Sequence, residues 1–324
     1  MSIKVGIVGY GNLGKGVETA VLKNKDIKLI GIFSRREPKD IQSIFGKVLP
    51  YSTIEDYIGK IDVMILCGGS ATDILIQGPY IASMFNTVDA FDTHAKISDY
   101  MQTLENICKE SNTLSMVSTG WDPGLFSYVR VLSDAILPDG MSHTFWGKGV
   151  SQGHSDAIRR IEGVVDARQY TVPNEEVKTK IRNGEQLNIS TYDKHSRLCY
   201  VVVEDNADKL LIEKEIKEMP NYFSDYETTV KFVDLETLRK KHNKLPHGGN
   251  VIRLGKTSED NKDVVEFSLK LDSNPEFTGS VMVACARAVY RLSKENKKGS
   301  ITMMDVPLTY FIDKDRKEII KEYM

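Results

Sequence analysis

The stretch IKVGIVGYGNLGKGVETAVLKN, residues 3–24, decides the fold. Its first part is short, rich in β-branched residues and closed by a glycine, which predicts a strand over 3–9. Its second part carries apolar residues at helical spacing, which predicts a helix over 13–24. A strand followed at once by a glycine-rich turn and a helix opens a β–α–β unit. This unit predicts the first strand of a parallel α/β sheet.

The glycines of the turn, Gly9, Gly11 and Gly14, have the spacing GxGxxG. Gly9 permits a tight turn, Gly11 lets a pyrophosphate approach the backbone, and Gly14 lets the helix pack closely on the strand. The helix N-terminus adds free N–H groups and a partial positive charge for the phosphates. We therefore interpret the turn as a dinucleotide-binding site; a purely structural turn is the alternative.

Further strands are expected in the first third of the chain, over 27–33, 62–67, 86–92 and 112–118. Helical patterns lie between them, and the pattern over 73–85 would be bent or shortened by its proline. Strands that alternate with helices predict a Rossmann-type, doubly wound parallel sheet.

After about residue 120 the pattern changes to polar, mixed segments and longer strands such as RLCYVVVE and YETTVKFVD. These features predict a second, α+β domain with an antiparallel or mixed sheet. We expect a Rossmann domain over 1–120, to which 300–324 returns after the charged connector 293–300. The second domain is expected over 121–299.

The segment GIFSRRE, residues 31–37, ends the second predicted strand about where NAD-binding proteins place an acid for the ribose 2′-hydroxyl. Here Ser34, Arg35 and Arg36 occupy that place, and Glu37 is slightly late for the ribose role. An arginine offers a planar fork of donors that suits a phosphate, and its face can stack on adenine. The segment therefore predicts NADP(H) as the cofactor; a pair of solvated arginines is the alternative.

Three other segments fall at the carboxyl ends of predicted strands, where open α/β sheets bind ligands: 67–70, 91–94 and 118–124. Two acids in them, Asp92 and Asp122, are candidates to bind an ammonium group and to accept its proton. The alternatives are a turn residue for Asp92 and a helix cap ahead of the following proline for Asp122.

The second domain holds a glycine-punctuated loop, HTFWGKGVSQGHSDAIRRI, which could close on a small polar ligand through backbone N–H groups. Its alternative is an ordinary connection with the tryptophan in the core. Arg197 precedes a strand and could pair with a substrate carboxylate, or could simply be solvated. The histidines do not show helical metal-ligand spacing, so no metal is expected.

The composition is that of a globular protein: 324 residues, 41% hydrophobic, 27% charged and a net charge of −2. No overall charge draws the chain to nucleic acid, and no run of about 18 apolar residues predicts a membrane span. The chain opens as a strand rather than as a signal peptide. Its four cysteines are scattered, which fits a reducing cytoplasm.

The blocks GYGNLG, GIFSRR, STGWDPG, HTFWG, SQGHSDA and LPHGG together resemble the meso-diaminopimelate dehydrogenase family, along nearly the whole chain. The resemblance implies NADP+-dependent oxidative deamination of meso-2,6-diaminopimelate at its D-centre, with release of ammonia. The product would be L-2-amino-6-oxopimelate, which cyclises to tetrahydrodipicolinate, a precursor of lysine and cell wall. It also implies a homodimer whose second domain binds substrate and dimerises.

The resemblance implies two sets of residues in this chain. The substrate contacts would be Asp92, Asp122, Trp146, Gln152, Gly153, Thr171, Arg197, His247 and Asn274. The cofactor contacts would be Gly9, Tyr10, Gly11, Asn12, Leu13, Gly14, Ser34, Arg35, Arg36, Cys67, Gly68, Gly69, Ser70, Ala90, Phe91, Asp92, Thr119, Gly120, Trp121, Asp122 and Pro123. The aspartates are the candidate catalytic residues, and either of them, or water, could take the proton of the reacting amine.

Two rival functions share the first domain. One is an NADP-dependent reductase of an imine or aldehyde, which would differ in the second domain. The other is a non-catalytic NADP(H) sensor, which would not need the polar segments of that domain.

Overall fold

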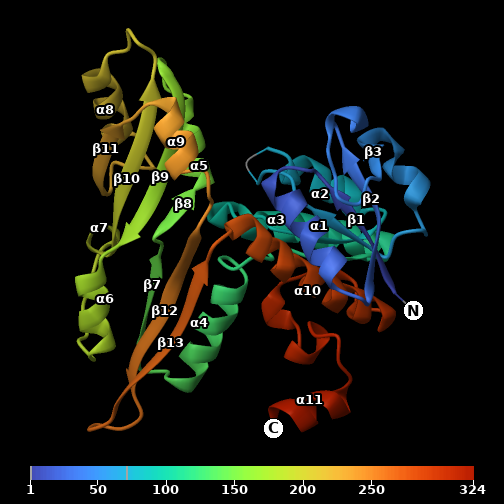
Figure 1. The fold of residues 1–324 in the computed structure, drawn as a ribbon. Helices are drawn as coiled ribbons and strands as arrows, with labels where there is room; N and C mark the ends of the chain where they lie inside the picture. The colour runs from blue at the N-terminus through green and yellow to red at the C-terminus, as the bar shows by residue number, and fades with distance from the viewer. Residues whose placement is uncertain (1, 71) are drawn as a thin grey trace. The chain divides into compact units, whose positions relative to one another are not determined.

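The computed structural model describes residues 2–70 and 72–324. The chain divides into two compact units (Figure 1). Unit 1 comprises Met1–Tyr128 and Pro275–Met324, and unit 2 comprises Val129–Asn274.

Unit 1 is built on a seven-stranded sheet in the order β14-β6-β5-β4-β1-β2-β3, and all its strand pairs are parallel. Its strands are β1 (Ile3–Val8), β2 (Ile27–Ser34), β3 (Val48–Pro50), β4 (Val63–Leu66), β5 (Asn86–Asp89), β6 (Leu114–Met116) and β14 (Gly299–Ile301). The strand order reverses beside β1, which is the point where such sheets bind dinucleotides. The expected Rossmann-type sheet is confirmed.

Helices cover both faces of this sheet because each face is apolar. The helices are α1 (Asn12–Lys23), α2 (Ile74–Ala82), α3 (Ile97–Ser111), α10 (Asn274–Lys294) and α11 (Arg316–Tyr323), and short 3-10 turns are η1 (Pro38–Asp40), η2 (Tyr51–Tyr57), η3 (His94–Lys96), η4 (Met303–Asp305) and η5 (Leu308–Tyr310). Apolar residues of α1 and α10 share one core with β1 and β2. Residues of α2 and α3 form another. Pro79 lies inside α2, which ends at Ala82.

The chain returns to unit 1 at residue 275 and not near 300, because α10 packs on α1 (Figure 1). The two helices approach through glycines: a Cβ on Gly279 would lie 2.5 Å from the carbonyl carbon of Gly16. The buried Arg287 of α10 then donates to Asp26 at 2.5 Å and to the Phe311 carbonyl oxygen at 2.7 Å. The polar end of α10 looks like a connector in sequence, but its buried face belongs to the core of unit 1.

Unit 2 contains two sheets. A four-stranded mixed sheet has the order β11-β10-β9-β8, and a three-stranded antiparallel sheet has the order β13-β12-β7. The strands are β7 (Met141–Trp146), β8 (Gly149–Ser151), β9 (Val164–Pro173), β10 (His195–Val203), β11 (Glu227–Phe232), β12 (His247–Lys256) and β13 (Lys262–Leu271). The helices are α4 (Leu125–Ile136), which begins at the end of unit 1, and α5 (Gln152–Arg159), α6 (Glu175–Arg182), α7 (Thr191–Lys194), α8 (Lys209–Glu218) and α9 (Leu235–Lys241). The expected mixed sheet is confirmed.

One face of the four-stranded sheet changes character along its strands. Side chains two residues apart share a face, and on this face Ala167, Cys199 and Val201 pack with α5 and α8 in an apolar core. Further along the same face the buried residues become polar. These are Gln169, Thr171, His195 and Arg197. This face of the sheet is therefore apolar at one end and polar at the other.

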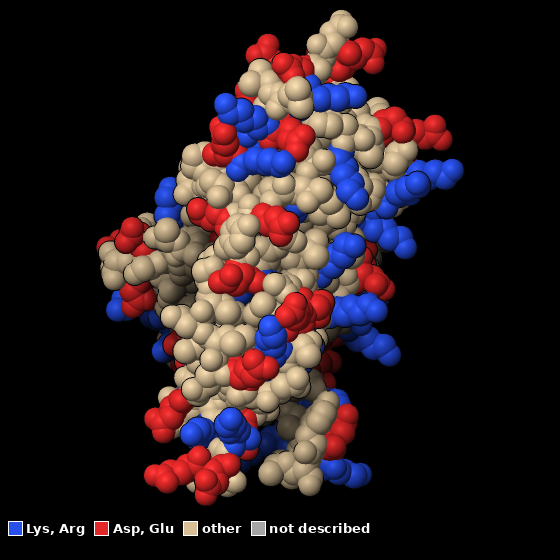
Figure 2. Space-filling view, turned by 90° about the vertical axis from the view of Figure 1, so that its left-hand side faces the viewer, with Lys and Arg blue, Asp and Glu red and all other residues tan. Residues whose placement is uncertain are grey.

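Charges of both signs are interspersed on the face of the molecule drawn in Figure 2. Opposite charges also pair within helices, as Lys217 and Glu213 do at 2.6 Å on α8. Such mixing gives no electrostatic reason for a polyanionic partner at this face. Within the described part of the chain, none of the helices has the length and apolar character needed to cross a membrane.

The contact between α1 and α10 predicts a stability effect. We expect Gly279→Ala to lower the free energy of unfolding by at least about 1 kcal/mol, because the added methyl group meets backbone atoms that cannot rotate away. The steric cost of the added methyl group must outweigh the gain of about 1 kcal/mol that alanine usually has over glycine in a helix. Urea unfolding measures it. The neighbouring exposed Ser280→Ala is the control, and an unchanged or higher stability of Gly279→Ala would contradict the packing.

Candidate functional site

The glycine turn of unit 1 has the geometry of a phosphate cradle. Gly9 has a φ of +88° and donates its N–H to the Phe33 carbonyl oxygen at 2.9 Å. A Cβ on Gly14 would lie 2.3 Å from the Gly9 carbonyl oxygen, so only glycine lets α1 start this close to the turn. Gly11 is the N-cap of α1, makes no side-chain cap and is followed by no acid in the first turn. The N–H groups and the positive end of α1 therefore fit a pyrophosphate.

Two arginines at the end of β2 are held near this turn. The Ser34 hydroxyl accepts the N–H of Arg36 at 3.0 Å, and the Arg36 guanidinium donates to the Tyr10 carbonyl oxygen. Arg35 pairs with Asp73, just ahead of α2, at 2.6 Å. Both arginines are exposed. Their forks fit a 2′-phosphate on a ribose at this end of the turn.

A buried carboxylate supports the turn from behind. Glu18 on α1 accepts from the Tyr10 hydroxyl, from the Ser43 hydroxyl at 2.7 Å and from the Phe45 N–H at 2.6 Å. Burial alone would raise the pKa of Glu18, but these hydrogen bonds outweigh it and the pKa is lowered. Burial and the bond to Glu18 raise the pKa of Tyr10 to about 12. The ionised Glu18 thus fixes Tyr10, whose carbonyl oxygen holds Arg36.

A second buried acid, Asp89 at the end of β5, joins three segments. Its carboxylate accepts from the Phe91 N–H at 3.0 Å, the Ser118 N–H at 3.2 Å and the Tyr100 hydroxyl at 3.0 Å. Its carbonyl oxygen accepts from both the N–H and the hydroxyl of Thr119. The segments that lead into Asp92 and Asp122 are therefore fixed by one residue.

Asp92 and Asp122 lie in separate loops of unit 1. The Asp92 N–H donates to the Ser70 hydroxyl at 3.1 Å, which brings together two segments singled out from the sequence. Asp122 lies in a tight turn, where a Cβ on Gly124 would come within 2.3 Å of the Gly120 carbonyl oxygen.

In unit 2, Trp146 ends β7 beside the first residue of β10. The main-chain N–H of Trp146 donates to Nε2 of His195 at 2.8 Å. The imidazole and indole rings stack with their centroids 5.2 Å apart and an angle of 26° between their planes. His195 is buried, and burial, with Arg197 and Lys194 nearby, lowers its pKa to about 3.

Arg197 and Thr171 face each other across β10 and β9. The guanidinium of Arg197 donates to the Thr171 hydroxyl at 2.5 Å and lies 3.7 Å above the ring centroid of Tyr226. Arg197 is 6% exposed, yet its Nε has no hydrogen-bond partner among the residues that the structure describes. Burial lowers its pKa. A buried guanidinium with a free donor is suited to an incoming carboxylate.

The loop around β8 brings other predicted residues to Thr171. Gly149 pairs with Thr171 in the sheet, and a Cβ on Gly149 would lie 2.5 Å from Cγ of His247. Asn274 donates its N–H to the Leu245 carbonyl oxygen at 2.9 Å, two residues before His247. Thr171 and Arg197 thus lie on paired strands of one sheet, and Trp146 and His247 lie on paired strands of the other. The contacts of Gly149 with His247 and of His195 with Trp146 link the two pairs.

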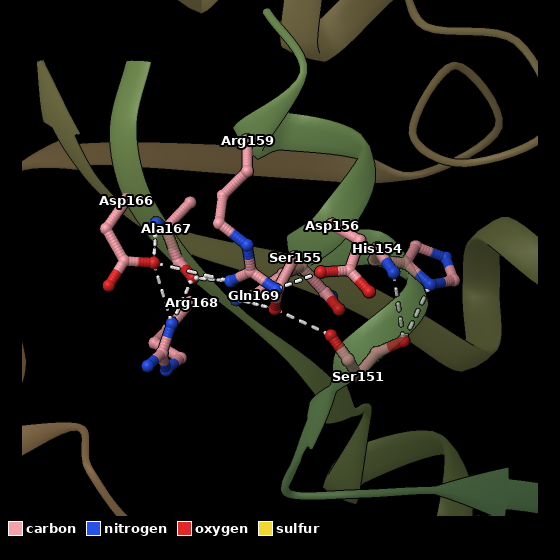
Figure 3. Close-up of polar contacts among 9 residues, drawn as sticks. All are labelled: Ser151, His154, Ser155, Asp156, Arg159, Asp166, Ala167, Arg168 and Gln169. Atoms are coloured by element: carbon pink, nitrogen blue, oxygen red, sulfur yellow. Dashed lines mark hydrogen bonds and ion pairs between the residues drawn. The ribbon is translucent and has the colours of Figure 1, made fainter. Parts of the chain in front are cut away.

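Helix α5 starts with the exposed Gln152 and Gly153 and is anchored by polar contacts (Figure 3). Its N-cap is Ser151, whose hydroxyl accepts from the His154 N–H. The Ser155 hydroxyl donates to the Ser151 carbonyl oxygen at 2.6 Å and accepts the Gln169 N–H at 3.0 Å.

At the other end of α5, Arg159 pairs with Asp156 and Asp166 and donates to the Ala167 carbonyl oxygen at 2.9 Å (Figure 3). Asp166 also accepts from Arg168 at 2.9 Å. These contacts of Arg159 and Asp166 hold the SQGHSDA segment against β9. Among the described residues there is no group of three or more His, Cys, Asp or Glu side chains that could hold a metal ion.

Comparison with known proteins decides the family. A family model described as the diaminopimelic acid dehydrogenase C-terminal domain matches residues 120–273. A curated meso-diaminopimelate D-dehydrogenase from Ureibacillus thermosphaericus is 52% identical over 323 residues, covering 99% of each chain. The protein of that name from Corynebacterium glutamicum is 44% identical over 94% of each chain. The chain belongs to the meso-diaminopimelate D-dehydrogenase family.

Solved structures similar to this chain share its fold. A multiply substituted meso-diaminopimelate dehydrogenase from Clostridium tetani, solved with DAP, has a TM-score of 0.95 at 52% identity over 100% of both chains. The C. glutamicum enzyme in complex with DAP has a TM-score of 0.94 at 41% identity, covering 100% of this chain and 99% of that one. An engineered D-amino acid dehydrogenase bound to NADP+ has a TM-score of 0.90 at 39% identity over 100% of both chains.

Several polar residues that organise this member of the meso-diaminopimelate D-dehydrogenase family were not singled out from the sequence: Glu18, Asp73, Asp89, Gln169 and His195. The alternation HSRLC does place His195 and Arg197 on one face of a strand. The pattern does not show that this face is buried, so it could not separate His195 from a solvated histidine.

The buried Asp89 predicts a change of stability with pH. Burial raises its pKa from 3.8 to about 6, against the hydrogen bonds that it accepts. An acid with a raised pKa stabilises the fold fully below its unfolded pKa, and that contribution is lost as the pH rises through its folded pKa. The loss is about 3 kcal/mol at 1.36 kcal/mol per pKa unit.

We therefore expect wild type to lose about 3 kcal/mol relative to Asp89→Asn between pH 4 and 7, since asparagine stays neutral. Urea unfolding across this range measures the difference, and the exposed Asp56→Asn is the control. A difference between wild type and Asp89→Asn that stays constant with pH would contradict the assignment.

Proposed function

We propose that the protein catalyses the reversible, NADP-dependent oxidative deamination of meso-2,6-diaminopimelate at its D-centre. In this reaction the substrate, NADP+ and water give L-2-amino-6-oxopimelate, ammonium, NADPH and a proton. The observation that carries the proposal is the full-length identity of 52% to a curated enzyme of that name. Because the identity extends along both units, it disfavours a reductase that shares only the first domain. It equally disfavours a non-catalytic NADP(H) sensor.

The substrate residues are supported by the spacing of substitutions in a relative. The C. tetani variant solved with DAP is changed at a Gln, a Thr, an Arg, a Pro, a His and an Asn, separated by 19, 26, 49, 1 and 27 residues. The same types stand at the same intervals in this chain, at Gln152, Thr171, Arg197, Pro246, His247 and Asn274. Five of these are among the residues that the sequence resemblance named.

In the proposed site Arg197 and Thr171 bind a substrate carboxylate. The Arg197 guanidinium is already desolvated and has an unpaired Nε among the described residues. It therefore offers a charge-assisted bond at little further desolvation cost. His247 and Asn274 complete the polar contacts at the end of the substrate that does not react.

Asp92, Asp122 and Trp146 surround the reacting D-centre in this proposal, and Gln152 and Gly153 are further substrate contacts. The carboxylates attract the ammonium group, and one of them or water takes its proton, since the amine must be neutral before its α-carbon can lose a hydride. The bound cofactor supplies the hydride acceptor. Trp146 supplies a flat wall that excludes water from this centre.

The cofactor residues are the segments of unit 1 that the resemblance named, from the glycine turn through Ser34–Arg36, Cys67–Ser70, Ala90–Asp92 and Thr119–Pro123. In this view unit 1 is the NADP-binding domain, and unit 2 binds substrate and forms the homodimer. Exposed apolar residues of α4, Val131 (56%), Leu132 (50%) and Ile136 (55%), are candidates for the dimer contact. Sedimentation should then show twice the chain mass of 36.5 kDa. We place the enzyme in the cytoplasm, where its four cysteines, all buried and free, stay reduced.

The arginine pair predicts the cofactor preference. We expect the double variant Arg35→Ala/Arg36→Ala to raise the dissociation constant of NADP+ tenfold or more, because a charge-assisted contact is worth about 1.5–3 kcal/mol. The constant for NAD+ should change far less. Fluorescence titration measures both, and Lys39→Ala, an exposed cation of the same loop, is the control. Equal losses for the two cofactors would remove the phosphate assignment.

The activity itself is tested by absorbance at 340 nm. The protein is mixed with NADP+ or NAD+ and, separately, with the meso, L,L and D,D isomers of diaminopimelate. We expect fast reduction of NADP+ with the meso isomer and none with the L,L isomer, which has no D-centre. No reduction with any isomer, by protein that still binds NADPH, would refute the proposed reaction and leave the cofactor site standing.

A further inference from the structure

His195 is a buried residue next to the proposed site that has no role so far. It is 2% exposed and begins β10, two residues before Arg197 on the same face of the sheet. Its neighbours on β7 are Phe145, at 5.9 Å between ring centroids, and Trp146, at 5.2 Å.

His195 holds Trp146 by two independent contacts. Nε2 of His195 accepts the Trp146 N–H at 2.8 Å, and the imidazole stacks on the indole at 26°. The first contact fixes the main chain at the end of β7. The second limits the rotation of the indole.

The hydrogen bond also defines the charge of the ring. Because Nε2 accepts, it carries no proton, and the proton of the neutral imidazole is on Nδ1. Burial and the cations Arg197 and Lys194 oppose a second proton, and they lower the pKa of His195 to about 3. At neutral pH the acceptor is therefore always available to Trp146.

We propose that His195 is a positioning residue that holds the indole of Trp146 at the reacting centre. This inference rests on the proposed function, in which Trp146 lines the D-centre. A fixed indole holds the α-carbon in the orientation for hydride loss, so that releasing it lowers kcat more than it raises KM. The carboxylate contacts at Arg197 and Thr171 remain, and they hold KM nearly constant.

Two variants separate the contacts. His195→Phe keeps a ring that can stack and removes the acceptor, whereas His195→Gln keeps an oxygen acceptor near the position of Nε2 and removes the ring. We expect each to lower kcat for meso-diaminopimelate at least tenfold while KM changes less than threefold. The dissociation constant of NADP+ should be unchanged because the cofactor binds unit 1, and the nearly constant KM shows that unit 2 of each variant keeps its fold.

A double-mutant cycle with Trp146→Phe distinguishes positioning from a general structural role. If His195 acts through Trp146, adding His195→Phe to Trp146→Phe should cost less than twofold more in kcat. A purely structural role would give multiplying losses in the cycle. Variants of His195 that do not fold at all would likewise show a structural role and overturn the proposal.

A spectroscopic arm does not depend on the reaction. The chain has two tryptophans, so in a Trp121→Phe background the emission comes from Trp146. We expect both His195 variants to raise the acrylamide quenching constant of Trp146 at least twofold. If wild type does not oxidise meso-diaminopimelate, the proposed function fails. The quenching experiment then still tests the contact between His195 and Trp146. Active wild type with unchanged kcat and unchanged quenching in both variants would overturn the proposal.

Discussion

The buried guanidinium of Arg197 is the constraint on which unit 2 depends. A cation taken out of water costs several kcal/mol unless an anion compensates it, and no ion pair within residues 2–70 and 72–324 includes Arg197. A hydroxyl and an aromatic face compensate it in part. The nearby His154 and His195 are kept neutral, since burial and then Arg197 lower their pKa values to about 4 and about 3. Arg197 is thus a buried positive charge with no carboxylate partner among the described residues, and a substrate carboxylate would neutralise it.

Unit 1 buries carboxylates close to its proposed cofactor segments. Its arginines at the end of β2 are exposed, and the buried acids Glu18 and Asp89 are each held by three hydrogen bonds to the carboxylate. These acids fix loops, whereas the exposed cations are available to a phosphate. Rigid loops with available donors suit a cofactor that binds and leaves with each turnover.

Much of the fold could be predicted because local signals were strong. The parallel sheet was indicated by the strand, glycine turn and helix of residues 3–24 and by the alternating strands and helices that follow. The cofactor was indicated by Ser34–Arg36. The return of the chain at residue 275 could not be predicted, because Gly16 and Gly279 are far apart in sequence and their contact exists only in the folded unit. His195 and Asp89 were missed for the same reason, since burial gives them their roles and burial depends on tertiary packing.

The most direct test of this account is the unfolding free energy of Arg197→Met, measured with and without meso-diaminopimelate. If the guanidinium is kept for the substrate, the variant without ligand should be as stable as wild type or more stable, by up to about 4 kcal/mol. It should also lose the stabilisation that wild type gains from the ligand, about 2.7 kcal/mol at one hundred times its dissociation constant. A variant that is several kcal/mol less stable without ligand, and is still stabilised fully by it, would contradict the account.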